Sequence, residues 1–162
     1  MALSTEEIMD EWTSLAYQRY TEEVTLKPGV EEFLRYGKEN GILFGIATSN
    51  GRILYEAALK ALQIDTYFTA MRTSGEVNVG KPSPDIYLKV AEDMQVRPEH
   101  CLVFEDVPMG ILAGKRAGMQ VCAVYDEFSR PLDQEKKKLA DYYIHDFHDV
   151  MDRIKERNTD GK

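Results

Sequence analysis

The sequence of 162 residues has few cysteines, an excess of acidic over basic residues, and no long apolar run. Its two cysteines, Cys101 and Cys122, lie in apolar stretches, so we interpret them as small buried hydrophobes and not as a disulfide framework or metal site. No apolar stretch is long enough to span a bilayer, and the acidic start lacks the basic and apolar regions of a signal peptide. We therefore expect a cytoplasmic protein with no membrane partner.

The charge balance limits the possible partners. The formal net charge is −8, which has the same sign as nucleic acids and anionic membranes and disfavours both. A phosphorylated substrate is also repelled at long range. Its attraction must then be local, from a bound cation, from Lys81 and from backbone N–H groups. The length and the 43% of apolar residues predict one ordinary globular domain.

Hydrophobic periodicity predicts helices that alternate with short strands. Ser4 and Glu7 form a capping-box pattern at the start of a helix that runs to about residue 22. Later helices are predicted at about 28–41, 52–62, 84–94, before Gly118 and at 147–157, with strands at 42–47, 67–71, 101–104, 121–124 and 142–144. Ser83 is the predicted N-cap of the helix that starts at Pro84. The charged segment 125–138 is predicted to be a mobile loop. This order predicts a parallel three-layer α/β fold.

Polar residues follow three of the predicted strands. Glu105 and Asp106 end one buried strand, Thr48-Ser49-Asn50 ends another, and Lys81 lies between Gly80 and Pro82. In open parallel sheets ligands bind at the carboxyl ends of the strands, where loops and helix N-termini converge. We expect all three segments at that edge.

Together these segments have the chemistry of a phosphoryl-transfer site. The segment 48–50 offers a hydroxyl and N–H groups for a phosphate oxygen, and Lys81 offers a compact positive charge. Asp106, with Glu105, offers hard oxygen ligands for Mg²⁺. Each piece alone has a plainer interpretation, as an N-cap, a solvated lysine or a helix-capping acid pair, and only their joint placement favours function. Asp126, after the next strand, is interpreted as a surface acid.

The segments 46–50, 80–87 and 103–119 resemble motifs two, three and four of the haloacid dehalogenase superfamily. The closest resemblance is to its β-phosphoglucomutase-like phosphatases, and it extends from about Leu26 to Ile144. It implies a Rossmann-like core and a Mg²⁺-dependent phosphatase or phosphomutase of a small phosphorylated metabolite. By the same resemblance the roles are phosphoryl binding for Thr48, Ser49 and Asn50, stabilisation of nucleophile and phosphate for Lys81, and Mg²⁺ binding for Asp106 with Glu105.

One part of that resemblance is missing. Members of the superfamily form a phosphoaspartate on the first Asp of an Asp-x-Asp-x-Thr segment, whose second Asp is the general acid and base. The nearest match, Asp10-Glu11-Trp12-Thr13, lacks the second aspartate, has its threonine one residue early and lies in a helical pattern. We therefore assign no nucleophile and expect this chain to be inactive.

The opening helix resembles the last helix of the family's α-helical cap. We therefore predict a remnant cap helix at 1–24, a core domain at 25–157 and a disordered tail at 158–162. In the family the first strand lies between those we place at 42–47 and 101–104. Its absence would leave backbone N–H and C=O groups on both of these strands without hydrogen-bond partners. Either these strands pair directly, or a segment of another molecule fills the slot by dimerisation or strand exchange, or the chain is marginally stable.

Two rival interpretations come from other classes. The chain could be a non-catalytic protein, either one that binds phosphate and Mg²⁺ or a self-associating fragment. The absent aspartates favour this rival, whereas Thr48, Lys81, Glu105 and Asp106 favour descent from an active site. A flavodoxin-like signalling domain also has acids at strand ends. It would require them after the first strand, where this sequence has none.

Overall fold

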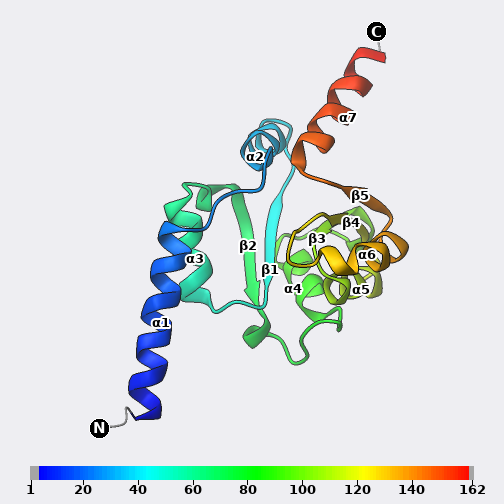
Figure 1. Ribbon diagram of the computed structural model, residues 1–162. Coiled ribbons are helices and arrows are strands. Elements are labelled where there is room, and N and C mark those ends of the chain that lie inside the picture. Colours follow the sequence, from blue (N-terminus) through cyan, green and yellow to red (C-terminus); the bar gives the residue numbers. More distant parts are fainter. Residues whose placement is uncertain (1–3, 161–162) are drawn as a thin grey trace.

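The computed structural model describes residues 4–160 as an α/β fold (Figure 1). The helices are α1 (Thr5–Glu22), α2 (Val30–Glu39), α3 (Arg52–Ala61), α4 (Asp85–Asp93), α5 (Pro108–Arg116), α6 (Asp133–Leu139) and α7 (Phe147–Asp160). The strands are β1 (Phe44–Thr48), β2 (Phe68–Thr73), β3 (Leu102–Glu105), β4 (Gln120–Val124) and β5 (Tyr142–Ile144). Every strand pair is parallel, so the predicted fold class is confirmed. Within residues 4–160, no helix has the length and apolarity that a membrane crossing requires.

The strands form two separate sheets. β1 pairs with β2, and β3, β4 and β5 form a second sheet in that order. Among the described residues no pairing joins β1 to β3, so direct pairing of these two strands, one of the three predicted alternatives, does not occur. Within residues 4–160, the edge of β1 away from β2 and the edge of β3 away from β4 therefore have no strand partner.

Burial of the strands reflects this division. β4 has neighbours on both sides, and its Val121 and Ala123 are completely buried. The sequence of β1 is just as apolar, and we expected it to be covered on both faces, yet none of its residues is buried. Ile42 and Leu43, which we assigned to the same strand, precede it and are 46% and 49% exposed. A sheet position beside β1 that is not filled by the described residues accounts for this exposure.

Helices on both faces hold the two sheets together. On one face Phe33 of α2 contacts Phe44 of β1 and Phe104 of β3 edge to face, at 5.5 Å and 5.4 Å between ring centroids. Phe147, at the start of α7, lies 5.3 Å from Phe33 and joins the same cluster. On the other face α4 packs against β1 and β2, while α5 packs against β3 and β4. The result is the predicted three-layer arrangement around a divided sheet.

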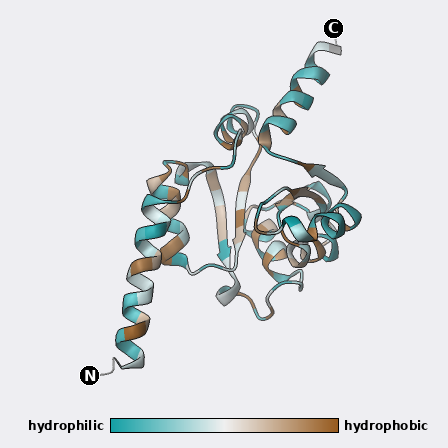
Figure 2. Cartoon of the chain, in the orientation of Figure 1, coloured by the Kyte–Doolittle hydropathy of each residue, from teal (hydrophilic) through white to brown (hydrophobic). Residues whose placement is uncertain are grey.

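The first helix extends away from the core along α3 (Figure 1). Its predicted capping box is present, because Ser4 Oγ accepts from Glu7 N at 3.2 Å and Ser4 N donates to the Glu7 carboxylate at 2.7 Å. No residue of α1 is buried. Brown bands mark hydrophobic residues along this helix in Figure 2, and its Trp12 side chain is 68% exposed. The predicted amphipathic helix therefore exists, but its apolar side is uncovered.

Several predicted boundaries are wrong. Segment 125–138 is not a loop throughout, because α6 begins at Asp133 and buries Lys136 completely, which a charged sequence does not reveal. Ser83 is not the N-cap of α4, since its hydroxyl donates to the Asp85 side chain and Pro84 occupies the cap position. The last helix continues to Asp160, past its predicted end at 157, and the final residues of the predicted tail lie outside the described residues.

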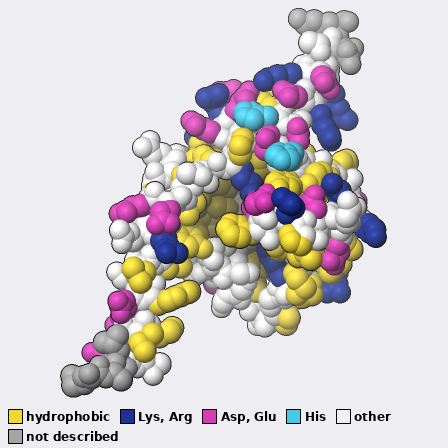
Figure 3. Space-filling model, viewed as in Figure 1, with side chains coloured by type: hydrophobic (Ala, Val, Ile, Leu, Met, Phe, Trp, Pro, Cys, Tyr) yellow, Lys and Arg dark blue, Asp and Glu magenta, His cyan; other side chains and the backbone are white. Residues whose placement is uncertain are grey.

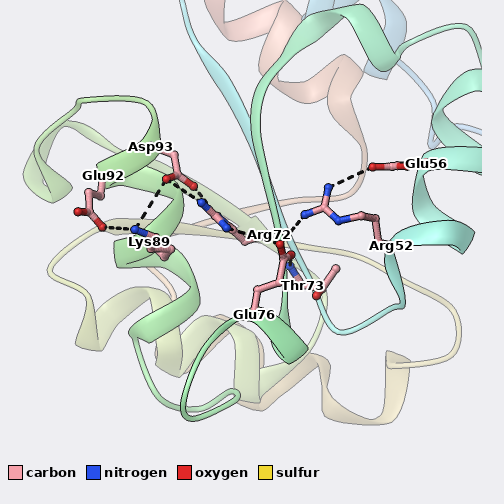
Figure 4. Close-up of polar contacts among 8 residues, drawn as sticks. All are labelled: Arg52, Glu56, Arg72, Thr73, Glu76, Lys89, Glu92 and Asp93. Atoms are coloured by element: carbon pink, nitrogen blue, oxygen red, sulfur yellow. Dashed lines mark hydrogen bonds and ion pairs between the residues drawn. The ribbon is translucent and has the colours of Figure 1, made fainter.

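A network of ion pairs ties the outer edge of the first sheet to its flanking helices (Figure 4). Glu76 accepts from Arg52 at the start of α3 and, at 3.5 Å, from Arg72 of β2. Arg72 also donates two hydrogen bonds to Asp93 at the end of α4, at 2.6 Å and 3.0 Å. A backbone hydrogen bond from Thr73, then Arg52, lower the pKa of Glu76, and Arg72 lowers the pKa of Asp93.

This network predicts acid sensitivity. Both carboxyl groups have a lower pKa in the folded chain than in the unfolded chain, so their stabilisation is present above the unfolded values of 4.5 and 3.8 and is lost as the pH falls below them. We expect the urea midpoint to fall between pH 5 and pH 3, and to fall less in Glu76→Gln. A Glu92→Gln variant, whose residue is 70% exposed, serves as the control. Equal acid sensitivity of Glu76→Gln and the parent chain would contradict the assignment.

Candidate active site

A cavity of about 350 Å³ lies where β1 and β3 end. The surface of the described residues has a hollow between the elements of the first sheet and those of the second, and apolar side chains lie in it (Figure 3). Five of the six predicted site residues line the cavity, namely Thr48, Ser49, Lys81, Glu105 and Asp106. The sixth, Asn50, is exposed and not among the lining residues, although its backbone N–H donates to Thr48 Oγ1 at 3.1 Å. Segments far apart in the sequence therefore meet at one edge, as the positions of their strands require.

The loop after β1 presents hydrogen-bond donors to the cavity. Thr48 ends β1, and α3 begins after Gly51 without any side-chain cap on its first turn. The uncapped N–H groups of α3 and the positive end of its dipole favour an anion at this point. Ser49 Oγ accepts a hydrogen bond from Ser74 Oγ at 3.3 Å, which links this loop to the one after β2. The arrangement suits a phosphate oxygen near Thr48 and Ser49.

Lys81 and Glu105 form an ion pair that is almost completely buried. The side chains are 13% and 9% exposed, and Lys81 Nζ donates to Glu105 Oε1. The hydroxyl of Tyr87 donates to the same oxygen, and the Tyr87 ring lies 5.1 Å from the ammonium. Burial, followed by the negative charge of Glu105, raises the pKa of Tyr87, so its hydroxyl stays a donor. One oxygen of Glu105 is thus engaged in holding Lys81.

Gly110 is a second residue that sequence reasoning missed, besides Tyr87. A Cβ atom at Gly110 would lie 2.1 to 2.4 Å from the carboxyl atoms of Glu105, closer than any side chain tolerates. A side chain at this position in the first turn of α5 would therefore displace the flexible end of Glu105 from its place beside Lys81. Glycine within a predicted helix was the available signal, since its usual helix cost implies a compensating close contact.

Asp106 differs from its neighbour because its carboxylate has no hydrogen-bond partner among residues 4–160, although the residue is half-buried in the cavity wall. An unengaged carboxylate facing a cavity fits a hard cation. Over the same residues no group of three or more His, Cys, Asp or Glu side chains is arranged to hold a metal ion. Mg²⁺ needs only one or two carboxylates because it keeps several waters. Asp106 therefore fits Mg²⁺ better than Glu105 does.

Lys27, in the loop before α2, is a further cation that we did not predict. It lines the cavity, and its ammonium lies 2.6 Å from Asp126 Oδ2 and donates to Tyr125 O at 3.3 Å. The hydrogen bond from Lys27 lowers the pKa of Asp126. Asp126, interpreted from sequence as a surface acid, is only 22% exposed and orients a cavity lysine. No sequence signal joins two residues so far apart in the chain.

Comparison with known proteins identifies the family. The family model of haloacid dehalogenase-like hydrolases matches residues 3–118. The chain belongs to this family. Its structure is similar to β-phosphoglucomutase from Clostridium difficile, with a TM-score of 0.74 and 26% identity over 98% of this chain and 70% of that one. It is also similar to CbbY from Rhodobacter sphaeroides in complex with phosphate, with a TM-score of 0.78 and 26% identity over 91% and 66% of the two chains.

Among curated haloacid dehalogenase-like relatives, the phosphorylated carbohydrates phosphatase of Thermotoga maritima is 38% identical over 101 residues, which are 62% of this chain and 47% of that protein. The chain spans about half the length of the curated relatives that it matches. The predicted resemblance to the phosphatase and phosphomutase group is thus confirmed. The roles of the individual site residues and the predicted domain boundaries remain predictions.

The buried ion pair predicts strong energetic coupling. Glu105→Leu leaves the Lys81 ammonium with no carboxylate partner, and Lys81→Met leaves the carboxylate unpaired, so each should lower the free energy of unfolding by about 3 kcal/mol. The double variant should cost at least about 1 kcal/mol less than the sum, as measured by urea unfolding at neutral pH. The exposed pair Lys89 and Glu92, 2.7 Å apart, is the matched control, with singles within about 0.5 kcal/mol of the parent. Additive effects at Lys81 and Glu105 would refute the coupling.

Proposed function

We propose that this chain carries the phosphate-binding and Mg²⁺-binding parts of a phosphatase or phosphomutase that acts on a small phosphorylated metabolite. The observation that carries the proposal is that Thr48 at the end of β1, Lys81 between β2 and α4, and Asp106 after β3 line one cavity. Thr48, Ser49 and the start of α3 bind the phosphoryl oxygens, and Lys81 neutralises the charge that gathers on them. Asp106 holds Mg²⁺, which when bound supplies further neutralisation of that charge.

The same proposal includes very low or no turnover by these 162 residues alone. Covalent phosphoryl transfer needs a carboxylate nucleophile beside the phosphate. Among the described residues, Glu105 and Asp106 are the acids that line the cavity; the first is engaged by Lys81 and Tyr87, and the second is assigned to Mg²⁺. The near-match to the nucleophile motif lies on α1, where Asp10 is exposed. Binding without turnover is therefore the expected behaviour.

The binding site can be tested apart from turnover. We expect Mg²⁺ and inorganic phosphate to shift backbone NMR signals around the cavity, because the residues assigned to both ligands line it. Asp106→Asn should weaken Mg²⁺ binding at least about tenfold, and Lys81→Ala should weaken phosphate binding similarly. Asp10→Asn is the matched control and should change neither. With an aryl phosphate and Mg²⁺ we expect no turnover above background.

Two outcomes would contradict the proposal separately. Mg²⁺-dependent turnover that Asp106→Asn abolishes would show that the chain has a nucleophile after all. Equal binding of Mg²⁺ and phosphate by the parent, Asp106→Asn and Lys81→Ala chains would show that the cavity does not hold these ligands.

A second candidate function, a non-catalytic and self-associating protein, is favoured by the divided sheet. The edges of β1 and β3 that lack strand partners among residues 4–160 are templates for pairing with another chain, as in a homodimer with exchanged strands. We expect sedimentation velocity to show dimers or larger species whose share grows with protein concentration. Trp12→Lys removes an exposed apolar residue of α1 and should not change this share. If Trp12→Lys abolishes association, or if the chain stays monomeric, the sheet edges are not the cause.

A further inference from the structure

The main chain of Asp106, the proposed metal ligand, is held from outside the cavity. The ladder between β3 and β4 stops at the pair Glu105 and Ala123, so Asp106 is the first residue of the strand end without a ladder partner. Its carbonyl oxygen instead accepts a hydrogen bond from Ser129 Oγ at 2.6 Å. Ser129 lies in the loop between β4 and α6 and is itself buried, at 7% exposure. This contact attaches the main chain of Asp106 to a loop 23 residues further along.

The direction of this hydrogen bond is set by a buried lysine. Lys136 of α6 is completely buried, and its ammonium donates to Ser129 Oγ at 3.0 Å and to Val124 O at 3.1 Å. Its third neighbour is Asp133 Oδ1, also at 3.0 Å. An ammonium has three protons and cannot accept; two of them are directed at Ser129 Oγ and Val124 O, and the Asp133 carboxylate balances its charge as an ion pair. A completely buried cation is costly unless it is paired in this way.

Because Lys136 can only donate, Ser129 Oγ must accept from it, and the single hydroxyl proton is left for another acceptor. Two carbonyls are within reach, that of Asp106 at 2.6 Å and that of Asp126 at 3.5 Å. The shorter contact is much the stronger hydrogen bond. The positive charge on Lys136 also polarises the hydroxyl and strengthens its donation. The order of donors is therefore Lys136, which donates to Ser129 Oγ, and then Ser129, which donates to the Asp106 carbonyl.

We propose that Lys136 and Ser129 are positioning residues for Asp106, which fix its main chain so that its unengaged carboxylate faces the cavity. This inference rests on the proposed function, because it concerns the residue assigned to Mg²⁺. Lys136 acts at a distance, through Ser129, and touches neither the cavity nor a ligand. Groups of this kind, which orient a metal ligand without binding the metal, commonly change metal affinity 10-fold to 100-fold when they are removed.

The experiment uses the full chain labelled with ¹³C and ¹⁵N, with Mg²⁺ alone as the probe. Ser129→Ala removes the hydroxyl, and Lys136→Met removes the ammonium while preserving most of the volume. We expect both to shift the carbonyl-carbon signal of Asp106 and to weaken Mg²⁺ binding about tenfold or more. Ser129→Thr keeps the hydroxyl and should preserve both properties. Tyr143→Phe is the matched control, because it removes the 2.6 Å hydrogen bond to Asp133 beside the same lysine without touching Ser129.

The outcomes separate this inference from the proposed function. If the parent chain binds Mg²⁺ and both variants bind it equally well, the positioning role is overturned while the metal site stands. If the Asp106 carbonyl signal is unchanged in Ser129→Ala, the order of donors is also overturned, even if Lys136→Met does not fold. A loss of affinity in Tyr143→Phe as large as in Ser129→Ala would show that general loosening of α6 is the cause. A parent chain that does not bind Mg²⁺ overturns the proposed metal role of Asp106, and the carbonyl signal still tests the order of donors.

Discussion

Backbone hydrogen bonding between strands is the constraint on which this molecule depends. Each interior strand of a parallel sheet must satisfy both of its edges, and β4 does so between β3 and β5. Within residues 4–160, β1 and β3 each pair with a strand along one edge only. Side-chain contacts hold the two strands in position relative to each other across the remaining space. Phe33 does this from one face by contacting a ring on each strand, which is packing rather than pairing. The cavity lies at the end of that space, so the site and the division of the sheet have one structural origin.

Sequence reasoning could predict what depends on local pattern. The apolar runs of β3 and β4 and the periodicity of α3 specify their own elements, and the order of elements then places Thr48, Lys81 and Asp106 at one sheet edge. The resemblance to the family's motifs predicts the same residues, because the matching segments contain them. Both lines of reasoning are local in the chain, which is why they agreed.

What the sequence could not predict depends on contacts between distant residues. Tyr87 shares an acceptor with Lys81, and Lys27 pairs with Asp126 across 99 positions of the chain, so no spacing rule finds either. Lys136 lies in a run of charged residues that reads as solvated, yet it is completely buried because three oxygens from different segments surround its ammonium. Burial of a charged residue is decided by such partners and not by its own hydropathy.

The two adjacent acids at the end of β3 show how neighbours in sequence acquire different tasks. Alternation of side chains along a strand directs Glu105 and Asp106 to different surroundings. Glu105 meets the Lys81 ammonium, the Tyr87 hydroxyl and the close approach of Gly110, and its charge is balanced there. Within the described part of the chain only the main chain of Asp106 is held, so the charge of its carboxylate is left unbalanced in the cavity wall.

That imbalance has a consequence for how an anion could enter the cavity. Among residues 4–160 the lysines that line it are Lys27 and Lys81, and they are paired with Asp126 and Glu105, so each positive charge is already partly balanced before an anion binds. With Asp106 unbalanced and a net charge of −8 on the chain, the local potential opposes a phosphate. Under the proposed function, a cation on Asp106 reverses the sign of that local charge, and each ligand then raises the affinity for the other, as linkage requires. Under the proposed function, Mg²⁺ binding and phosphate binding are therefore coupled through the charge of Asp106.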